Sequence, residues 1–390
     1  MLNVLTLSSL FPDATRPNFG IFVERQTAAL AMRPGVAVRV VAPIGLPVWP
    51  LAGTSRFKAQ AALPLREDWS GLDVSRPRFT TLPGTGARFH VPAMRRALVP
   101  MLDRLRDEQR FDVIDASFFF PDGPAAVALG RRYGVPVSIK ARGADIHHWG
   151  HAPATRRQVA QAAAQADGLL AVSDAMAEDV AALGVSRHRI RVHHTGVDQA
   201  RFQPIDRLSA RAALGITGPI VVSLGALIPR KGHGVVIDAV ARLPGVTLVI
   251  IGEGADRAAL AARAERLGVA DRVRLVGGIA HGALPEWLGA ADVMALASVS
   301  EGLANAWVES IACGTPVVIT PAGGAADVVT SRAAGRIAQA DAESFATAIR
   351  DLLDQPPDPW ATRAAVRDFT WPANAAALHS HLAELVGRGR

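Results

Sequence analysis

Short apolar runs typical of buried strands alternate with helix-like runs along almost the whole chain. Strands that are apolar throughout are covered on both faces, and a helix between two of them lets the chain return so that they lie parallel. The alternation therefore predicts an α/β fold of doubly wound parallel sheets with right-handed crossovers. The expected strands are residues 2–7, 36–43, 113–116, 135–140, 168–172, 190–193, 220–224, 247–252, 273–277, 293–297 and 316–320.

The expected strands fall into two successive sets, which predicts two domains joined near residues 198–208. A chain of 390 residues, 49% of them apolar, is large enough for two cores. We place a first domain at 1–200, a second at 201–365 and a final segment at 366–390, with helix expected over 360–385. Residues 44–90 are rich in proline and glycine, and we expect an irregular region there.

The charge of the chain points to anionic partners but not to nucleic acid. The net charge is +7 and comes almost wholly from arginine, since lysine occurs only at Lys58, Lys140 and Lys231. The basic residues are spread out and aromatic residues make up only 5%, which disfavours a nucleic-acid-binding surface. An anionic membrane surface or a phosphate-bearing substrate fits this charge better.

Cysteine usage and hydropathy disfavour three further classes of protein. The single cysteine, Cys313, rules out an intramolecular disulfide and a cysteine-based metal cluster, and no group of ligand residues has metal-site spacing. No run reaches the ~18 apolar residues that a membrane-spanning helix needs. Because the sequence starts directly in a strand-like run without a basic leader, we expect a cytoplasmic protein. Because no ligand group has metal-site spacing, we expect no metal.

Two glutamates flank an expected strand–helix junction in the last third of the chain. Glu301 follows the strand expected at 293–297, and Glu309 lies early in a helix expected at 306–313. Ligands of open parallel sheets bind beyond the carboxyl ends of the strands. The N–H groups at the intervening helix start suit a phosphate or a polar sugar. The pair therefore predicts a site for a polyhydroxylated, phosphorylated ligand.

The same stretch resembles the signature of a known enzyme family. Ser300-Glu-Gly-Leu-Ala-Asn305 is followed by Glu309-Ser-Ile-Ala-Cys-Gly-Thr-Pro-Val-Val318 and then by Gly323-Gly324. This Glu-x7-Glu pattern in its context resembles the retaining glycosyltransferases of family 4, also called glycosyl transferases group 1. The resemblance implies the GT-B fold, with two Rossmann-like domains facing a cleft and a C-terminal helix at 366–390 that crosses back to the first domain.

The resemblance implies a donor site built mainly from the second domain. A loop running from Gly225 to Gly232 follows a strand, and in the family its bases contact the donor diphosphate. Ala226 stands where the family usually has an arginine, so Arg230 is expected to supply that charge. The expected catalytic residues are Lys231, Arg230 and Glu301. The expected donor-binding residues are Gly20, Gly225, Glu253, Gly277, Gly302, Leu303, Ala304, Asn305 and Glu309.

In the first domain the resemblance points to residues on three loops. Gly20 precedes a helix and would let N–H groups at the helix start reach the donor phosphate. Arg142 stands where the family usually has the histidine of His-Gly-x-Asp. As a permanent cation it cannot transfer protons, but it can bind phosphate or an acidic acceptor. Asp122 and Asp145 match further positions on the acceptor side of the cleft.

The implied activity is transfer of a sugar from a nucleotide-diphosphate-sugar to an acceptor hydroxyl, with retention at the anomeric carbon. The expected acceptor is a saccharide or lipid-linked, as in polysaccharide or glycolipid synthesis. No cofactor is expected, because the nucleotide sugar is a co-substrate. Two alternatives stay open: a nucleotide-sugar epimerase of GT-B-like fold, and an inactive nucleotide-sugar-binding protein, which the departures at Ala226 and Arg142 would allow.

A basic amphipathic run gives a hypothesis about the membrane. Residues 93–110 place Leu98, Met101, Leu102 and Leu105 at helical spacing beside five arginines. Such a helix can lie on an anionic surface, each base near the lipid adding about 1 kcal/mol. One expectation is therefore peripheral contact with the inner face of the membrane. The other is that the apolar stripe packs on the sheet and the arginines are solvated.

Overall fold

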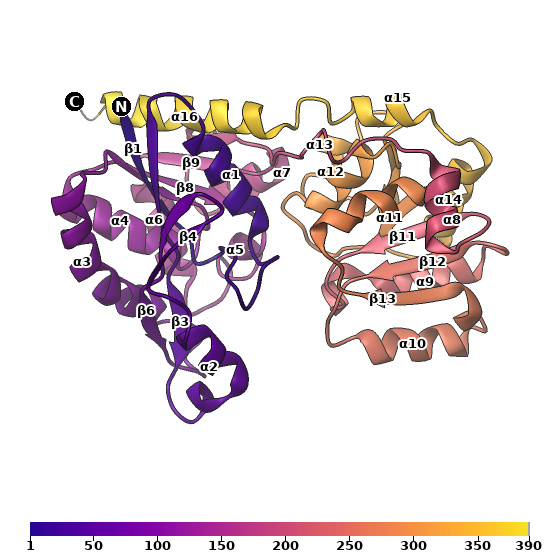
Figure 1. Cartoon of the computed structure of the whole chain (residues 1–390), viewed down its shortest axis with the longest axis horizontal. Helices are drawn as coiled ribbons and strands as arrows, with labels where there is room; N and C mark the ends of the chain where they lie inside the picture. Colours follow the sequence, from indigo (N-terminus) through magenta and orange to yellow (C-terminus); the bar gives the residue numbers. More distant parts are fainter. Residues whose placement is uncertain (389–390) are drawn as a thin grey trace. The chain divides into compact units, whose positions relative to one another are not determined.

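The computed structural model of the protein describes residues 1–388, which divide into two compact units. Unit 1 comprises Met1–Gly196 together with the C-terminal segment that begins at Trp371, and unit 2 comprises Val197–Thr370. Each unit is built on its own, mainly parallel sheet (Figure 1). The structure divides the chain after Gly196 and after Thr370, whereas the sequence analysis placed its boundaries after residues 200 and 365.

Within the described residues, the sheet of unit 1 has eight strands in the order β10-β9-β8-β7-β1-β2-β5-β4. Only β4 and β5 pair antiparallel. The chain order reverses between β1 and β7, and ligands of such sheets bind beside that point, beyond the carboxyl ends of the strands. The strands are β1 (Leu2–Leu7), β2 (Val36–Val41), β4 (Arg66–Trp69), β5 (Leu72–Ser75), β7 (Val113–Ala116), β8 (Val137–Ala141), β9 (Gly168–Ala171) and β10 (Ile190–Val192).

Helices pack on the sheet of unit 1. The helices α1 and α16 lie side by side (Figure 1), and Leu30, Leu378 and Leu382 pack with Val4 and Val113 of the sheet in a buried cluster. The helix α16 therefore belongs to unit 1, although unit 2 precedes it in the chain. The helices are α1 (Ile21–Ala31), α3 (His90–Glu108), α4 (Asp122–Tyr133), α5 (Ala144–His147), α6 (Arg156–Gln165), α7 (Asp174–Ala181) and α16 (Trp371–Arg388).

The expectation of an irregular region at residues 44–90 is wrong. β3 (Ile44–Pro47) and β6 (Arg78–Thr81) form a separate parallel pair, α2 (Ser55–Ala61) packs against β3, and β4 and β5 extend the main sheet. Ser70 and Gly71, which join β4 to β5, both have positive φ (54° and 80°), as a two-residue hairpin turn requires. These strands are four residues long, too short for periodicity to separate them from loops.

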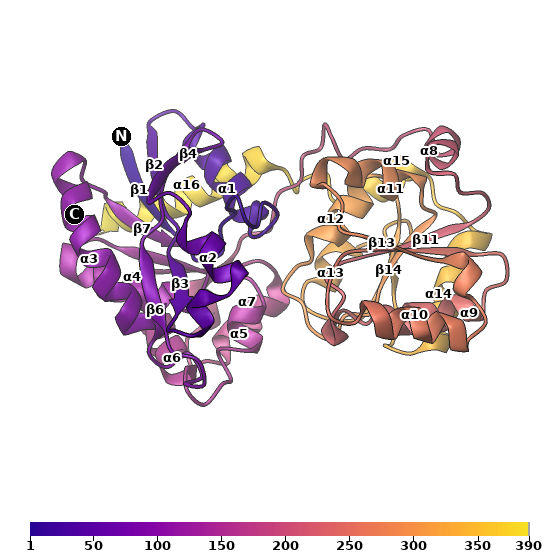
Figure 2. The ribbon, with the colours of Figure 1, turned by 60° about the horizontal axis from the view of Figure 1, so that its bottom comes forward.

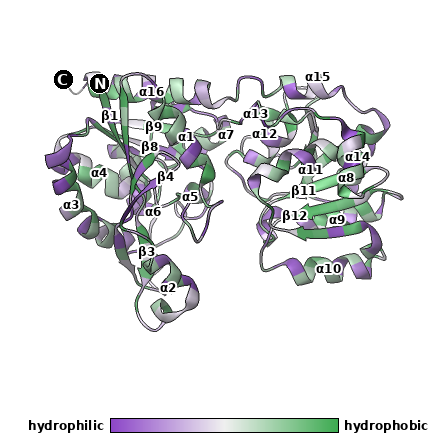
Figure 3. Cartoon of the chain, in the orientation of Figure 1, coloured by the Kyte–Doolittle hydropathy of each residue, from purple (hydrophilic) through white to green (hydrophobic). Residues whose placement is uncertain are grey.

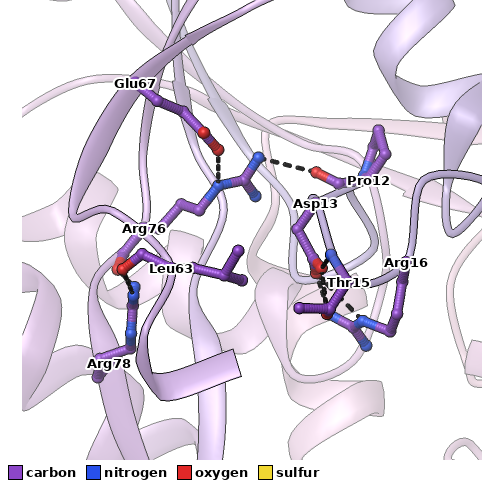
Figure 4. Close-up of polar contacts among 8 residues, drawn as sticks. All are labelled: Pro12, Asp13, Thr15, Arg16, Leu63, Glu67, Arg76 and Arg78. Atoms are coloured by element: carbon purple, nitrogen blue, oxygen red, sulfur yellow. Dashed lines mark hydrogen bonds and ion pairs between the residues drawn. The ribbon is translucent and has the colours of Figure 1, made fainter. Parts of the chain in front are cut away.

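A buried arginine ties this region to the loop between β1 and α1 (Figure 4). Arg76 is 1% exposed; its Nη2 donates to the Pro12 carbonyl at 2.8 Å, and its Nε pairs with Glu67. In the same loop, buried Asp13 accepts from Arg16 Nη2 at 2.7 Å and from the Thr15 N–H at 2.9 Å. Removing one partner of a buried ion pair is costly. These contacts therefore hold the loop that leads to Gly20.

Unit 2, which is described throughout, has six parallel strands in the order β13-β12-β11-β14-β15-β16, the order of a Rossmann sheet. The four inner strands β11, β12, β14 and β15 are mostly apolar and buried, whereas the edge strands β13 and β16 are partly exposed; β11 and β12 are green in Figure 3. Helices lie on both faces (Figure 2). The strands are β11 (Ile220–Leu224), β12 (Thr247–Ile251), β13 (Val273–Gly277), β14 (Val293–Leu296), β15 (Val317–Ile319) and β16 (Gly335–Ile337).

On one face of that sheet lie α9 (His233–Ala241), α10 (Arg257–Arg266) and α14 (Ala342–Asp354). On the other lie α8 (Arg207–Leu214), α11 (Leu284–Ala290), α12 (Asn305–Ala312) and α15 (Pro359–Ala364). The single helix expected at 360–385 is therefore wrong, since α15 and α16 are separate. β16 was also not expected, because a three-residue strand starting at a glycine carries no periodic signal.

The structure buries the apolar stripe of α3. Of the four predicted residues, Leu98, Leu102 and Leu105 are each at most 6% exposed, as is Met94, while Met101 is partly exposed. The helix α3 packs against α4 and β6. This is the second of the two arrangements expected for residues 93–110, so the stripe is not open to a membrane. Among residues 1–388, no helix combines the length and the apolar character needed to cross one.

Candidate functional site

The loops after β11 and β14 lie where the strand order of unit 2 reverses. The first loop carries Lys231, and the second carries Glu301. Because β11 and β14 are parallel neighbours, both loops leave the same edge of the sheet. The structure therefore brings together the two loops that the sequence analysis assigned to the donor site.

An ion pair joins these loops. Lys231 Nζ lies 2.5 Å from Glu301 Oε1, and Arg230 Nη1 lies 3.6 Å from Glu301 Oε2. The Glu301 side chain is only 9% exposed, so its charge needs these cations. The Arg230 side chain is 41% exposed and also donates to the Ser300 carbonyl. Together Lys231, Arg230 and Glu301 present two cations and one carboxylate at the edge of the sheet.

Glycine allows the loop of Lys231 to pass close to β14. Gly232 has φ +67°, and a Cβ there would lie 2.0 Å from the carbonyl oxygen of Ala297, just after β14. The N–H of Val299 donates to the Arg230 carbonyl at 2.9 Å. Only a residue without a side chain fits this approach. The position of Lys231 beside Glu301 thus depends on Gly232.

The start of α12 offers main-chain donors. Leu303 and Ala304 are buried, and the helix begins at Asn305 without a side-chain cap. Over residues 1–388, no acceptor takes the N–H groups of Leu303, Ala304 or Asn305. Unpaired N–H groups at a helix start attract anions. On the other side of the loop, the carbonyl of Gly302 accepts from the Gly324 N–H at 2.7 Å.

Glu309 has a partner that the sequence analysis missed. His281 Nε2 lies 2.7 Å from Glu309 Oε1, and the His281 ring packs edge-on against Phe202 with ring centroids 5.3 Å apart. Both side chains of the pair are mostly buried, at 14% and 12% exposed. No motif links two residues 28 positions apart, so the sequence carried no signal for this contact.

Three glycine turns follow the first three strands of unit 2. The N–H of Gly225 donates to the Ile251 carbonyl at 3.0 Å, and that of Gly252 donates to the Gly277 carbonyl at 2.9 Å. A Cβ on Gly252 would lie 1.9 Å from the Gly225 oxygen, so the turns pack against each other. The side chain of Glu253 is exposed beside them. These residues thus line the same edge as Lys231.

In unit 1, Asp122 links the loops after β1 and β7. Its Oδ2 accepts from the Ser9 N–H at 2.8 Å, while Oδ1 has no hydrogen-bond partner among the described residues. Burial raises the pKa of Asp122 to about 7, against the lowering effect of the Ser9 N–H and with a contribution from Asp145. The carboxyl group is fully buried at the switch point of the sheet.

Asp145 holds the loop after β8. Its carboxylate accepts from the N–H groups of Phe119, Arg142 and Gly143 at 2.9, 3.0 and 2.7 Å. Burial raises its pKa, and these three N–H groups oppose the shift. With its oxygens bound to the main chain, Asp145 shapes the loop that presents Arg142.

Arg142 itself is half-buried. Its Nε donates to the Ser117 carbonyl at 2.6 Å, its Nη2 to Gln26 Oε1 at 3.2 Å, and its guanidinium lies 4.9 Å from the Phe22 ring centroid. Burial lowers its pKa to about 10, so it stays cationic at neutral pH. Gln26 was missed, although a polar residue between Val23 and Leu30 on a buried helix face is a signal.

Gly20 caps the start of α1 with φ +72°. A Cβ there would lie 2.5 Å from the Leu10 carbonyl oxygen, so a larger residue cannot replace it without moving the loop. Gly20, Asp122, Arg142 and Asp145 all follow the carboxyl ends of strands of unit 1. Gly225, Lys231, Glu301 and Glu309 occupy the equivalent edge of unit 2.

Family models match both units of the chain. The model for glycosyltransferase family 4 matches residues 22–201, and the model for glycosyl transferases group 1 matches residues 206–368. Among curated proteins, D-inositol 3-phosphate glycosyltransferases of Mycobacterium tuberculosis and Mycobacterium bovis are 34% identical over 238 residues. The match covers 57% of this chain and 50% of each relative, so the chain spans about half their length.

Solved structures share the fold over the whole chain. Sucrose-phosphate synthase from Thermosynechococcus elongatus has a TM-score of 0.81 at 21% identity, covering 100% of both chains. HepE of Anabaena in complex with UDP has a TM-score of 0.74 at 20% identity, covering 98% of this chain and 100% of that one. Since the two family models match the two successive parts of this GT-B fold, the chain belongs to the group 1 glycosyltransferases, with an N-terminal region of glycosyltransferase family 4.

Proposed function

We propose that the protein moves a sugar from a nucleotide-diphosphate-sugar to an acceptor hydroxyl with retention at the anomeric carbon, in polysaccharide or glycolipid synthesis. The observation that carries this proposal is the Lys231–Glu301 pair beside the open N–H groups at the start of α12. Together these groups offer cations and helix-start donors to a diphosphate and a carboxylate to sugar hydroxyls. Family membership supports the same activity.

Lys231 and Arg230 stabilise the charge that develops on the departing diphosphate. When the bond to the sugar breaks, negative charge grows on the leaving group, and fixed cations at that point lower the barrier. The exposed Arg230 takes the place of the base missing at Ala226. The N–H groups of Leu303, Ala304 and Asn305 add main-chain donors to the same charge.

The two glutamates bind the donor rather than attack it. Glu301 is neutralised by Lys231 and Arg230, which makes it a weak nucleophile and suits it to hydrogen-bonding sugar hydroxyls. Glu309 accepts from the ribose of the nucleotide, with His281 holding its other side. Gly225, Glu253 and Gly277 shape the nucleotide end of the site.

Unit 1 supplies the acceptor side. Gly20 leaves the helix start of α1 open toward a phosphate, and the loops of Asp122, Arg142 and Asp145 bind the acceptor. A phosphorylated acceptor fits Arg142, and the curated relatives are named for D-inositol 3-phosphate. Peripheral contact with an anionic membrane, which would bring a lipid-linked acceptor within reach, is a further part of the proposal. The exposed Arg95 and Arg96 of α3 support that contact.

Mass spectrometry of nucleotide sugars tests the proposal. UDP-sugars come first, because the HepE structure holds UDP, and ADP- and GDP-sugars follow. We expect one donor to be consumed, slowly by water and faster with an acceptor, with an α-linked donor giving an α-linked product. EDTA should leave the rate unchanged, since side chains and helix starts neutralise the diphosphate.

The same assay separates the alternatives. A nucleotide sugar that is isomerised without an acceptor would establish the epimerase. Retention of a nucleotide sugar without turnover under all conditions would establish a binding protein. Loss of transfer in EDTA that magnesium or manganese restores would overturn the metal-independent mechanism.

A further inference from the structure

We propose that the site of unit 1 recognises an acidic group of the acceptor, a carboxylate or a phosphate, through Arg142, and that Gln26 and Lys140 position this arginine. The inference rests on the proposed function, because it gives the acceptor site a substrate class. Three observations support it: the hydrogen bonds that hold the Arg142 guanidinium, the bonds of Gln26 and Lys140 that support it, and the energetic cost of burying these charges.

The Arg142 guanidinium is fixed from one side only. Nε and Nη2 are bound by the Ser117 carbonyl and by Gln26, and Phe22 lies 4.9 Å from the guanidinium. Across the described residues, no acceptor takes the hydrogens of Nη1, and this nitrogen is not sealed from solvent. A clamped guanidinium with an open nitrogen is preorganised to bind an oxyanion, because little rotamer freedom is lost on binding.

Gln26 bonds to both Arg142 and Lys140. Its Oε1 accepts from Arg142 Nη2 at 3.2 Å and from Lys140 Nζ at 3.0 Å. Two donors converging on one oxygen fix the amide orientation, and the Gln26 Nε2 is consequently buried without an acceptor among the described residues. An unsatisfied buried donor costs stability. The Gln26 amide is therefore oriented so that its oxygen binds Arg142 and Lys140, although its own NH2 group is left without an acceptor among the described residues.

The Lys140 ammonium group is also bound by His193. Lys140 Nζ lies 2.8 Å from His193 Nδ1, and His193 Nε2 lies 2.9 Å from the Asn374 carbonyl. Since a carbonyl only accepts, Nε2 carries the ring hydrogen and Nδ1 accepts from Lys140. The chain of bonds runs from α16 through β8 to α1 and ends at Arg142. It gives the guanidinium a rigid support.

The cluster is costly, which argues for a role beyond packing. Lys140 is fully buried, and burial together with neighbouring Arg142 lowers its pKa well below the usual range. The counter-charge is buried Asp115, whose pKa burial raises to about 6 against the effect of both cations. A neutral side chain at 142 could bond to Ser117 and Gln26 without this repulsion. Perturbed groups gathered beside a candidate site are typical of binding and catalytic centres.

Inorganic phosphate is the probe for this site. Calorimetry would measure its binding to the full chain with the donor site filled by the nucleoside diphosphate that binds best. We expect Arg142→Gln to weaken phosphate binding about tenfold or more, as loss of charge-assisted hydrogen bonds does. Arg156→Gln, an exposed arginine of α6 with the same change in charge, is the matched control and should change it less than twofold.

Gln26→Glu separates positioning from packing. Glutamate keeps the shape of glutamine and pairs with both cations, so a purely structural role predicts equal or higher thermal stability and unchanged phosphate binding. Our proposal predicts equal or higher stability together with weaker phosphate binding, because the new carboxylate neutralises Arg142. Acceptor assays should show the same dependence, with D-glucose 6-phosphate used better than D-glucose or D-glucuronate better than its methyl ester.

The outcomes distinguish this inference from the proposed function. The acidic-acceptor inference alone is overturned if nucleotide sugars are turned over but Arg142→Gln does not change phosphate binding. It is also overturned if acidic and neutral acceptors are used equally well. Absence of nucleoside diphosphate binding and of turnover overturns the proposed function. Equal weakening by Arg142→Gln and Arg156→Gln assigns the effect to net charge and also overturns the inference.

Discussion

The candidate residues of unit 2 bond mainly to one another, whereas the carboxylates of unit 1 bond to the main chain. Lys231 pairs with Glu301, and His281 with Glu309, near the edge of the sheet. In contrast, Asp122 and Asp145 are fully buried and accept from backbone N–H groups. A side-chain pair can exchange one partner for a ligand without loss of the fold. A buried carboxylate that holds loops cannot. Substitutions in unit 2 should therefore affect activity most, and those in unit 1 stability.

The largest expected effect is on the pH dependence of stability in Asp122→Asn. The pKa of Asp122 is raised from 3.8 to about 7 by burial. The folded state therefore holds a proton that the unfolded state has released, so stability is full below about pH 4 and falls as the pH rises through 7. The loss amounts to roughly 4 kcal/mol. Asparagine is neutral and removes it.

Thermal unfolding at several pH values between 4 and 8 measures this effect. The melting temperature of Asp122→Asn relative to the natural protein should rise from pH 4 to 7 and then level off. Asp107→Asn, an exposed carboxylate of α3, is the control and should show no such trend. Parallel pH profiles for all three proteins would contradict the buried, protonated state of Asp122.

The sequence predicted unit 2 better than the outer part of unit 1, for physical reasons. The inner strands of unit 2 are buried on both faces, so their apolar runs are easy to recognise. The motif around Glu301 pointed to two loops that the structure places at one edge of the sheet. The strands within residues 44–81 are four residues long, and apart from the β4–β5 hairpin they pair with strands that are distant in the sequence, as β3 does with β6 and β5 with β2. Local pattern does not encode such pairing. The contact of His281 with Glu309 and the orientation of Gln26 toward Lys140 depend on packing between distant elements. These could be found only in three dimensions.

Lys231→Ala gives the next largest effect. Removing a cation that stabilises the departing diphosphate should lower the rate about a hundredfold. The fold should survive, because Arg230 still lies near Glu301. Lys58→Ala, an exposed lysine of α2, is the matched control and should keep full activity. The measurement is the initial rate of donor consumption together with the melting temperature of each variant.

Arg230→Ala tests whether this arginine replaces the base missing at Ala226. The rate should fall about tenfold, less than for Lys231→Ala, because the Arg230 side chain is more exposed and its charge better screened. Full activity in Arg230→Ala would refute the replacement and leave Lys231 as the single side-chain cation of the motif.

In Glu309→Ala the expected effect is on donor affinity rather than on the rate. The ribose loses a charge-assisted acceptor worth roughly 1.5–3 kcal/mol, which weakens nucleotide binding about tenfold or more. Glu309→Gln keeps the size of the side chain, and its nucleotide affinity should lie between those of the natural protein and Glu309→Ala. Calorimetry with UDP in folded protein measures the change. Unchanged nucleotide binding in both variants would show that Glu309 does not bind the ribose.

The smallest effect concerns α3 and the membrane. Because its apolar stripe is buried, α3 can meet a lipid surface only through exposed cations, each worth about 1 kcal/mol. We expect weak binding to phosphatidylglycerol vesicles at low salt, none to phosphatidylcholine vesicles, and loss of binding in Arg95→Glu with Arg96→Glu. The control is Arg156→Glu with Arg157→Glu on α6, which makes the same change in charge. Sedimentation with vesicles decides: equal loss in both double variants assigns the attraction to net charge, and binding that survives high salt requires an apolar contact other than α3.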